Sequence, residues 1–77
     1  PGDAIVAYPY NVSKFNLILS QSSVTVTQSN DISVEKIIRT FNLPAGYEAL
    51  GVLEQKQKGC LEKKSTRIIL RECNTGE

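Results

Sequence analysis

The sequence contains no histidine, no methionine and no tryptophan, and it has only two cysteines. Without histidine, proton transfer near neutral pH would need a carboxylate or a lysine with a perturbed pKa. The eight carboxylates form no catalytic motif, and the five glycines are too scattered for a phosphate-binding loop. A zinc site needs more nitrogen and sulfur ligands than two cysteines supply. The sequence therefore argues against an enzyme and against a bound metal or cofactor.

Long apolar segments and strong net charge are also absent. Runs such as Leu17–Leu19 and Ile68–Leu70 fall far short of the roughly 18 residues that a membrane-spanning helix needs. The net charge of +1 creates no overall field that would attract nucleic acid or an acidic membrane. A composition of 40% hydrophobic and 22% charged residues is typical of a folded protein. We therefore predict one small domain over residues 1–77, with no membrane span.

The two cysteines, Cys60 and Cys73, indicate either a disulfide or a pair of free thiols. A domain of this size buries little of its surface, so a disulfide is a common additional stabiliser outside the cytosol. We favour the bridge and predict a secreted or extracellular protein, with a cytoplasmic protein as the alternative. The chain begins Pro1-Gly2 and lacks methionine. We therefore expect a processed product or an excised fragment, from which any secretion signal has been removed.

Alternating apolar residues predict strands in the first third of the chain. The first 14 residues form either an irregular arm or an extra strand over Ala4–Ala7, which Pro9 would interrupt. Phe15–Leu19 and Val24–Thr27 have the period of half-buried strands. The polar residues between them are about as many as a common hairpin loop contains. We therefore predict a hairpin here.

The strongest helix signal follows this hairpin. Apolar residues recur with helical spacing at Val34, Ile37, Ile38 and Phe41. Asp31 or Ser33 can cap the start, and Glu35 lies in the first turn, where the helix dipole favours a negative charge. Pro44 ends the segment, because it disfavours helical geometry in the residue before it. We predict a short helix that packs on a sheet.

Two more strands are predicted in the second half. Tyr47–Glu54 has an apolar centre, where Gly51 indicates a bulge or close packing under the predicted helix. Thr66–Glu72 carries apolar residues on both faces and is therefore predicted to be a central strand. The polar segment between these strands is expected to be solvated.

A Cys60–Cys73 bridge limits where the last turn can lie. A tight hairpin centred on residues 62–65 would pair Cys60 with a residue near Ile69 rather than with Cys73. Residues 61–65 must therefore form a long loop, or the turn must lie nearer Thr66-Arg67. We favour the loop, because Thr66-Arg67 is a poor turn pair.

The predicted fold class is α+β, with one short helix on a small antiparallel or mixed sheet of four to five strands, in the order ββαββ with one disulfide. This order is similar to that of the ubiquitin-like β-grasp family, and the segment from Ser23 to Leu43 resembles its small sulfur-carrier members. Those carriers end in Gly-Gly, whereas this chain ends in Gly76-Glu77. We therefore assign no family from the sequence.

Candidate contact residues are basic or aromatic. Six cations gather in the C-terminal half, namely Lys56, Lys58, Lys63, Lys64, Arg67 and Arg71. Glutamates interleave with them, and no aromatic residue in this segment could stack on a base, so a solvated surface is favoured over a nucleic-acid site. Tyr8, Tyr10 and Tyr47 are candidate partner contacts, because exposed tyrosines are favoured at interfaces. Asn11 begins an N-glycosylation sequon.

These features together predict a non-enzymatic, secreted or surface-exposed module that binds a protein partner. A small effector, a toxin component, an inhibitor or an adhesion domain would fit. The alternative is an intracellular ubiquitin-like interaction domain with free thiols, and a nucleic-acid-binding domain is favoured less. The sequence indicates no oligomeric state.

Overall fold

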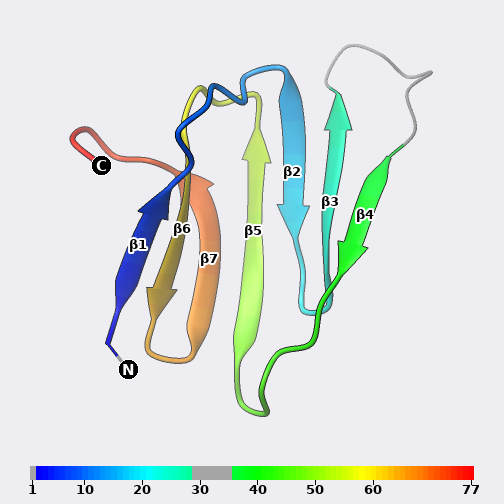
Figure 1. The fold of residues 1–77 in the computed structure, drawn as a ribbon, viewed down its shortest axis with the longest axis vertical. Coiled ribbons are helices and arrows are strands. Elements are labelled where there is room, and N and C mark those ends of the chain that lie inside the picture. Colours follow the sequence, from blue (N-terminus) through cyan, green and yellow to red (C-terminus); the bar gives the residue numbers. More distant parts are fainter. Residues whose placement is uncertain (1, 29–35) are drawn as a thin grey trace.

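The computed structural model of the chain describes residues 2–28 and 36–77, and its regular structure is entirely β (Figure 1). Its seven strands are β1 (Ala4–Ala7), β2 (Phe15–Leu19), β3 (Ser23–Gln28), β4 (Ile37–Thr40), β5 (Glu48–Glu54), β6 (Gly59–Lys64) and β7 (Arg67–Glu72). They form one mixed sheet in the order β1-β6-β7-β5-β2-β3-β4. No helix occurs in either described range. The predicted α+β fold, with the order ββαββ and the β-grasp likeness that depended on it, is therefore wrong.

The sheet consists of two antiparallel parts joined by one parallel pair. β2, β3 and β4 form a meander, and β5 pairs antiparallel with β2. On the other side, β6 pairs antiparallel with both β1 and β7. β5 and β7 run parallel, with Ala49 opposite Ile68 and Gly51 opposite Leu70. This parallel pair is possible because β6 lies outside β7 and carries the chain back to the starting end of β5.

The predicted helix is replaced by strand β4 within the described residues. Ile37–Thr40 pairs antiparallel with β3, with Ile37 opposite Val26 and Thr40 opposite Ser23. A helix here would leave the outer edge of β3 unpaired, whereas β4 satisfies its backbone groups. Ile37 and Ile38 thus point to opposite faces, and each is 52% exposed. The predicted cap residues Asp31, Ser33 and Glu35, and the apolar Val34, lie outside the described residues.

The predicted hairpin is confirmed. Of the two alternatives for the N-terminal segment, an irregular arm or an extra strand, the structure contains the strand over Ala4–Ala7. β2 and β3 pair from Phe15 opposite Gln28 to Leu19 opposite Val24. β1 pairs with β6 and ends at Ala7, immediately before Tyr8-Pro9. The proline therefore limits this strand as expected. The predicted central position of the last strand is also confirmed, because β7 lies between β6 and β5.

The preferred loop over residues 61–65 is wrong, and the turn that we disfavoured is closer to the truth. Strand β6 continues to Lys64, which pairs with Arg67 across a two-residue turn. Ser65 adopts a positive φ of 57° there. Asp3 Oδ1 accepts a hydrogen bond from the Ser65 backbone N–H at 2.9 Å. A residue distant in sequence therefore stabilises a turn that its own two residues do not predict.

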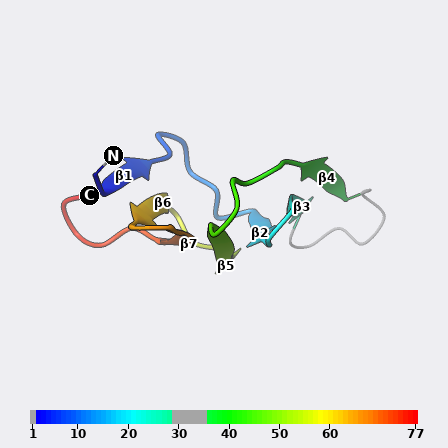
Figure 2. The ribbon, with the colours of Figure 1, turned by 90° about the horizontal axis from the view of Figure 1, so that it is seen from below.

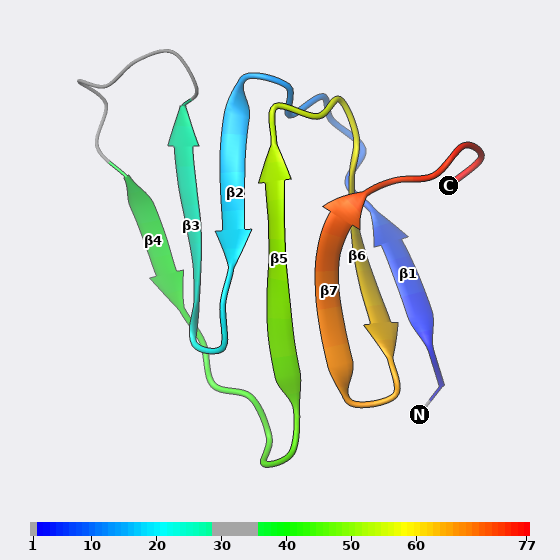
Figure 3. The same ribbon diagram turned by 180° about the vertical axis from the view of Figure 1, so that it is seen from behind.

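The sheet curves into a shallow arch (Figure 2). Its extents are 40 × 30 × 15 Å, so it is one layer thick. The two edge strands, β1 and β4, rise on the same side, and residues 8–14 cross on that concave side. The C-terminal segment leaves β7 on the opposite, convex side (Figure 3). Few apolar side chains are buried among the described residues, namely Ala49, Leu53 and Cys60.

Gly51 sits at the parallel junction of the sheet. Its φ is +145°, and a Cβ built there would lie 2.2 Å from the Leu70 carbonyl oxygen. A side chain at this position would therefore be strained and would also push β7 away from β5. Of the two possibilities that the sequence left open, close packing is thus found, against β7 rather than against a helix.

We predict that Gly51→Ala destabilises the fold by about 3 kcal/mol or more, because backbone strain and overpacking add. The matched control is Gly46→Ala, whose φ is also positive at 88° but whose Cβ would meet nothing within 4 Å. That variant should lose only about 1 kcal/mol. Urea unfolding monitored by circular dichroism measures both. Equal losses in the two variants would contradict the close approach at Gly51.

The Cys60–Cys73 disulfide is present, with a sequence separation of 13 residues. We predict that replacing both cysteines by alanine lowers the free energy of unfolding by about 3 kcal/mol, because the closed loop restricts the unfolded chain. Urea midpoints of the double variant and of the wild type with and without reductant provide the measurement. An unchanged midpoint in the double variant would show that the bridge does not stabilise the fold.

Candidate functional site

An apolar cleft of about 510 Å³ lies on the concave face of the sheet. Its lining comes from residues 6–12 and from strands β2, β3, β5, β6 and β7. The lining residues are Val6, Ala7, Tyr8, Pro9, Val12, Phe15, Leu17, Val26, Leu53, Gly59, Cys60, Leu61 and Leu70. Apart from the bridged Cys60, Tyr8 is the one residue of this lining whose side chain carries a polar group. The volume falls within the range of known ligand pockets, about 300–1,000 Å³.

Backbone hydrogen bonds hold residues 8–14 over this face. The Tyr8 N–H donates to the Gly59 carbonyl at 2.9 Å, and the Val12 N–H donates to the Gln57 carbonyl at 3.2 Å. The Gln55 N–H donates to the Phe15 carbonyl at 3.0 Å. The crossing segment is therefore bonded to the β5–β6 connection along its length. This wall of the cleft is set by the main chain.

The floor of the cleft follows from strand register. Val6, Leu61 and Leu70 lie opposite one another across β1, β6 and β7. Leu17 lies between Leu53 and Val26 across β5, β2 and β3. Directly opposed residues share a face, so each row presents its side chains to the same side.

The cleft is deep in the middle and open toward β1. Leu53 is 2% exposed, whereas Leu61 is 43% exposed and Val6 is 64% exposed. Gly59 contributes to the depth, because a Cβ there would lie 2.8 Å from Leu53 Cδ2. Solvent thus contacts a large apolar area at the β1 side of the cleft.

Two of the three predicted tyrosine contacts lie together at this cleft. The rings of Tyr8 and Tyr10 pack edge to face with centroids 5.5 Å apart. Tyr8 is 52% exposed and Tyr10 is 68% exposed. Next to them, Asn11 Oδ1 accepts hydrogen bonds from the Ser13 backbone N–H at 2.8 Å and from its hydroxyl at 2.6 Å. The sequon asparagine thus stabilises the turn over residues 11–13, which follows the tyrosine pair.

The third predicted tyrosine lies elsewhere. Tyr47 precedes β5 at the end of the sheet where β6 and β7 turn, whereas Tyr8 is bonded at the start of β6. Lys63 Nζ lies 5.9 Å from the centroid of the Tyr47 ring, within the range of a cation–π contact. The structure therefore does not bring Tyr47 to the cleft.

The predicted cations do not form one surface. Lys56 and Lys58 lie in the connection before β6, while the Lys63, Lys64 and Arg67 group lies at its other end. A six-residue strand separates the two groups by about 20 Å. Arg67 forms an exposed ion pair with Glu48 at 3.0 Å. No single basic stripe connects these residues, so their placement adds nothing to the nucleic-acid hypothesis.

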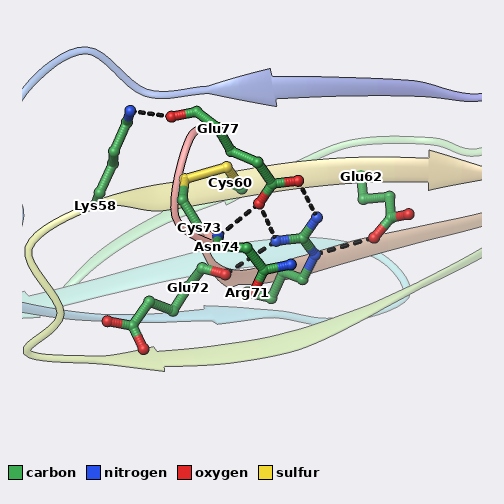
Figure 4. The surroundings of a disulfide bond; sticks show 8 residues. All are labelled: Lys58, Cys60, Glu62, Arg71, Glu72, Cys73, Asn74 and Glu77. Atoms are coloured by element: carbon green, nitrogen blue, oxygen red, sulfur yellow. Dashed lines mark hydrogen bonds and ion pairs between the residues drawn. A yellow bond between two sulfur atoms is a disulfide. The ribbon is translucent and has the colours of Figure 1, made fainter.

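The last predicted cation, Arg71, belongs to a cluster around the disulfide (Figure 4). Both of its terminal nitrogens donate to the Glu77 carboxylate, each at 2.8 Å. Its Nε donates to Glu62 at 2.9 Å. Lys58 Nζ donates to the Glu77 main-chain oxygen. Such two-pronged charged pairs are stronger and more directional than single ones.

Sequence reasoning missed the two glutamates of this cluster. Glu77 is distant from Glu62 in the sequence. The bridge between Cys60 and Cys73, whose Cα atoms are 5.0 Å apart, brings the two segments together. The signal that was available was the bridge itself, which returns the C-terminal residues to β6. Had the residues after Cys73 been traced from the bridge, an acidic residue could have been predicted beside Arg71.

Hydrogen bonds from Arg71 lower the pKa of the Glu77 carboxyl from 4.5 to about 2. A hydrogen bond from the Asn74 backbone N–H at 2.6 Å acts in the same direction. The same pairing raises the pKa of Arg71, chiefly through Glu77 and then through Glu62. Arg71 and Glu77 are thus both charged across the neutral range. The cluster is structural, because the same arginine binds both Glu62 and Glu77.

The described residues contain no group of three or more histidine, cysteine or acidic side chains placed to hold a metal ion. Nor do they include a helix of the length and apolarity needed to cross a membrane. No family model matches the chain, and neither a curated protein nor a solved structure matches it.

We predict a loss of stability in acid that depends on Glu77. Because the folded-state pKa is depressed, its contribution is complete above about pH 4.5 and is lost as the pH falls through 2. Glu77→Gln should flatten the dependence of the urea midpoint on pH in this window. In Figure 4 the Glu72 carboxylate points away from Arg71, so Glu72→Gln is the matched control and should keep the steep dependence. Identical profiles for the two variants would contradict the assignment.

Proposed function

We propose that this chain is a non-enzymatic protein-binding module that acts outside the cytoplasm, with the concave cleft as its contact surface. The observation that carries the proposal is the uncovered apolar lining of the cleft beneath residues 8–14. Large apolar patches on a protein surface typically mark interaction sites. The roles of effector, toxin component, inhibitor or adhesion domain are all compatible with such a surface.

The thinness of the sheet supports a protein partner. Domains usually bury a sheet face against a second layer of secondary structure. This sheet is 15 Å thick, and apolar residues such as Leu61 and Phe15 remain 43% and 37% exposed on its cleft side. An apolar surface of another protein would supply the layer that the described chain lacks on this face.

The chemistry of the rim supports an anchored contact. The floor of the cleft is apolar and suits one or two large aliphatic or aromatic side chains of a partner. Tyr8 and Tyr10 stand beside it with exposed rings and hydroxyls that can donate or accept at the partner's backbone. Binding energy would therefore concentrate in the buried anchor, with the tyrosines setting its orientation.

The disulfide supports the extracellular part of the proposal. Both cysteines are bridged and no free thiol remains, which favours the extracellular hypothesis over the intracellular alternative with free thiols. Stable disulfides persist mainly in oxidising compartments. The buried position of Cys60, which is 1% exposed, fits a structural bridge rather than a reactive one.

Selection from a random peptide display library tests the cleft, because the library assumes no particular partner. We expect the wild type to enrich peptides with at least one large apolar residue. Leu61→Ser, in the open part of the cleft, should weaken their binding by about tenfold or more. Val52→Ser is the matched control, because Val52 is 55% exposed on the opposite face of the sheet. That variant should bind within about twofold of the wild type.

Urea midpoints of both variants establish that they are folded before binding is compared. Peptides that bind both variants as well as the wild type would contradict the cleft as the contact surface. So would equal losses in the two variants, because the two positions lie on opposite faces. A library that yields no specific peptide would also count against a protein-binding cleft.

A further inference from the structure

Strand β1 has an outer side that no other strand of the described chain pairs with. The Tyr8 N–H points to β6, where it donates to Gly59. Because backbone groups alternate in an antiparallel strand, Ala4 and Val6 also face β6. Ile5 and Ala7 therefore direct their N–H and C=O groups outward, where a further strand can accept and donate.

This edge is short, with four residues, but it lacks the other devices that usually protect an edge. Charged residues, proline and bulges normally block the pairing of an exposed edge with another chain. The sequence Ala4–Ala7 contains no charge and no proline, and its register with β6 is unbroken. The opposite edge strand, β4, carries Arg39, whose guanidinium donates to the Ile38 carbonyl at 3.1 Å. β1 is the less protected of the two.

We propose that two copies of this chain pair antiparallel through β1, around a two-fold axis at Val6. In this register the outward groups of Ile5 exchange hydrogen bonds with Ala7 of the second copy, and the symmetry repeats the exchange. The two sheets join into one continuous sheet. The net charge of +1 sets little repulsion between the copies.

The side chains of β1 are self-complementary in this register. Ile5, which is 49% exposed, lies opposite the small Ala7 of the second copy. Tyr8 lies opposite Ala4, and the two copies of Val6 face each other on the axis. On either side of the axis, a bulky side chain thus lies opposite a small one. On the axis, the pairing covers Val6, which is 64% exposed in the single chain. A second copy fits this edge better than a strand of arbitrary sequence.

The proposal goes beyond the cleft and does not depend on it. Pairing uses the backbone at the outer side of β1, whereas the deep part of the cleft lies around Leu53 in the middle of the sheet, and Val6 at the open end is a residue that both surfaces share. The interface is small and therefore belongs to the weak, reversible class. Peptide binding by the cleft and dimer formation by the edge can thus succeed or fail separately.

Sedimentation of the chain from about 10 μM to about 1 mM tests the pairing. We expect the mass to rise from 8.5 kDa toward twice that value with concentration. Ile5→Pro removes an outward N–H but leaves the bonds to β6, so it should stay folded and monomeric throughout the range. Ile5→Val keeps the N–H and should still dimerise within about threefold of the wild-type dissociation constant. A monomeric wild type, or a dimer that persists in Ile5→Pro, overturns the proposal.

Disulfide trapping tests the register independently, including the case in which Ile5→Pro does not fold. The Cα atoms of the two Val6 residues should lie about 4.5 Å apart, as in any non-hydrogen-bonded pair. Val6→Cys should therefore form a covalent dimer under oxidised glutathione. Ile5→Cys is the control, because its two copies are offset by about 7 Å along the strands and should not cross-link. Failure of Val6→Cys to cross-link, or equal cross-linking by both variants, would rule out the axis at Val6.

Discussion

The parallel contact between β5 and β7 is the constraint on which the rest of the structure depends. Among the strands of the described residues, this pair alone joins β2, β3, β4 and β5 to β1, β6 and β7, and its register places Gly51 opposite Leu70. A Cβ at residue 51 would lie 2.2 Å from the Leu70 carbonyl oxygen, so the junction requires glycine in its positive-φ conformation. The central position of β7, the outer position of β6 and the edge position of β1 all follow once this pair forms.

The cleft is a consequence of the same junction. Because β1 belongs to one part of the sheet and β2 to the other, the residues between them must cross the face that spans the junction. They cross at the ends of β5 and β6, bonded to Gln57 and Gly59, and leave the apolar rows below open. Main-chain hydrogen bonds set the position of this crossing, so Leu53 is buried while the space toward Leu61 and Val6 stays open. The topology itself thus produces an apolar hollow at the side of a one-layer sheet.

The strands were largely predictable because alternation and turn residues are local signals, as in the hairpin of Phe15–Leu19. The helix was not, since an adjacent apolar pair such as Ile37-Ile38 fits one helical stripe and equally fits a strand exposed on both faces. The turn after Lys64 was not predicted for a different reason, because Asp3, near the other end of the chain, stabilises it. The candidate site likewise has one part that local sequence could indicate and one part that it could not. Tyr8 was found from its residue type, but the hollow beside it depends on strand order, which no local pattern records.

The two faces of the sheet differ in how the chain itself covers them. On the convex face, the disulfide returns residues 73–77 to β6, and Arg71 binds Glu62 and Glu77 with side chains that are only 20–25% exposed. Near Leu61 on the concave face, the described residues supply one crossing segment and no ion pair. A partner on the convex side there would have to displace charged pairs that are already satisfied, which costs desolvation without new gain. A partner on the concave side would displace only water from apolar carbon. The difference in free energy between these two exchanges favours the concave face as the binding surface.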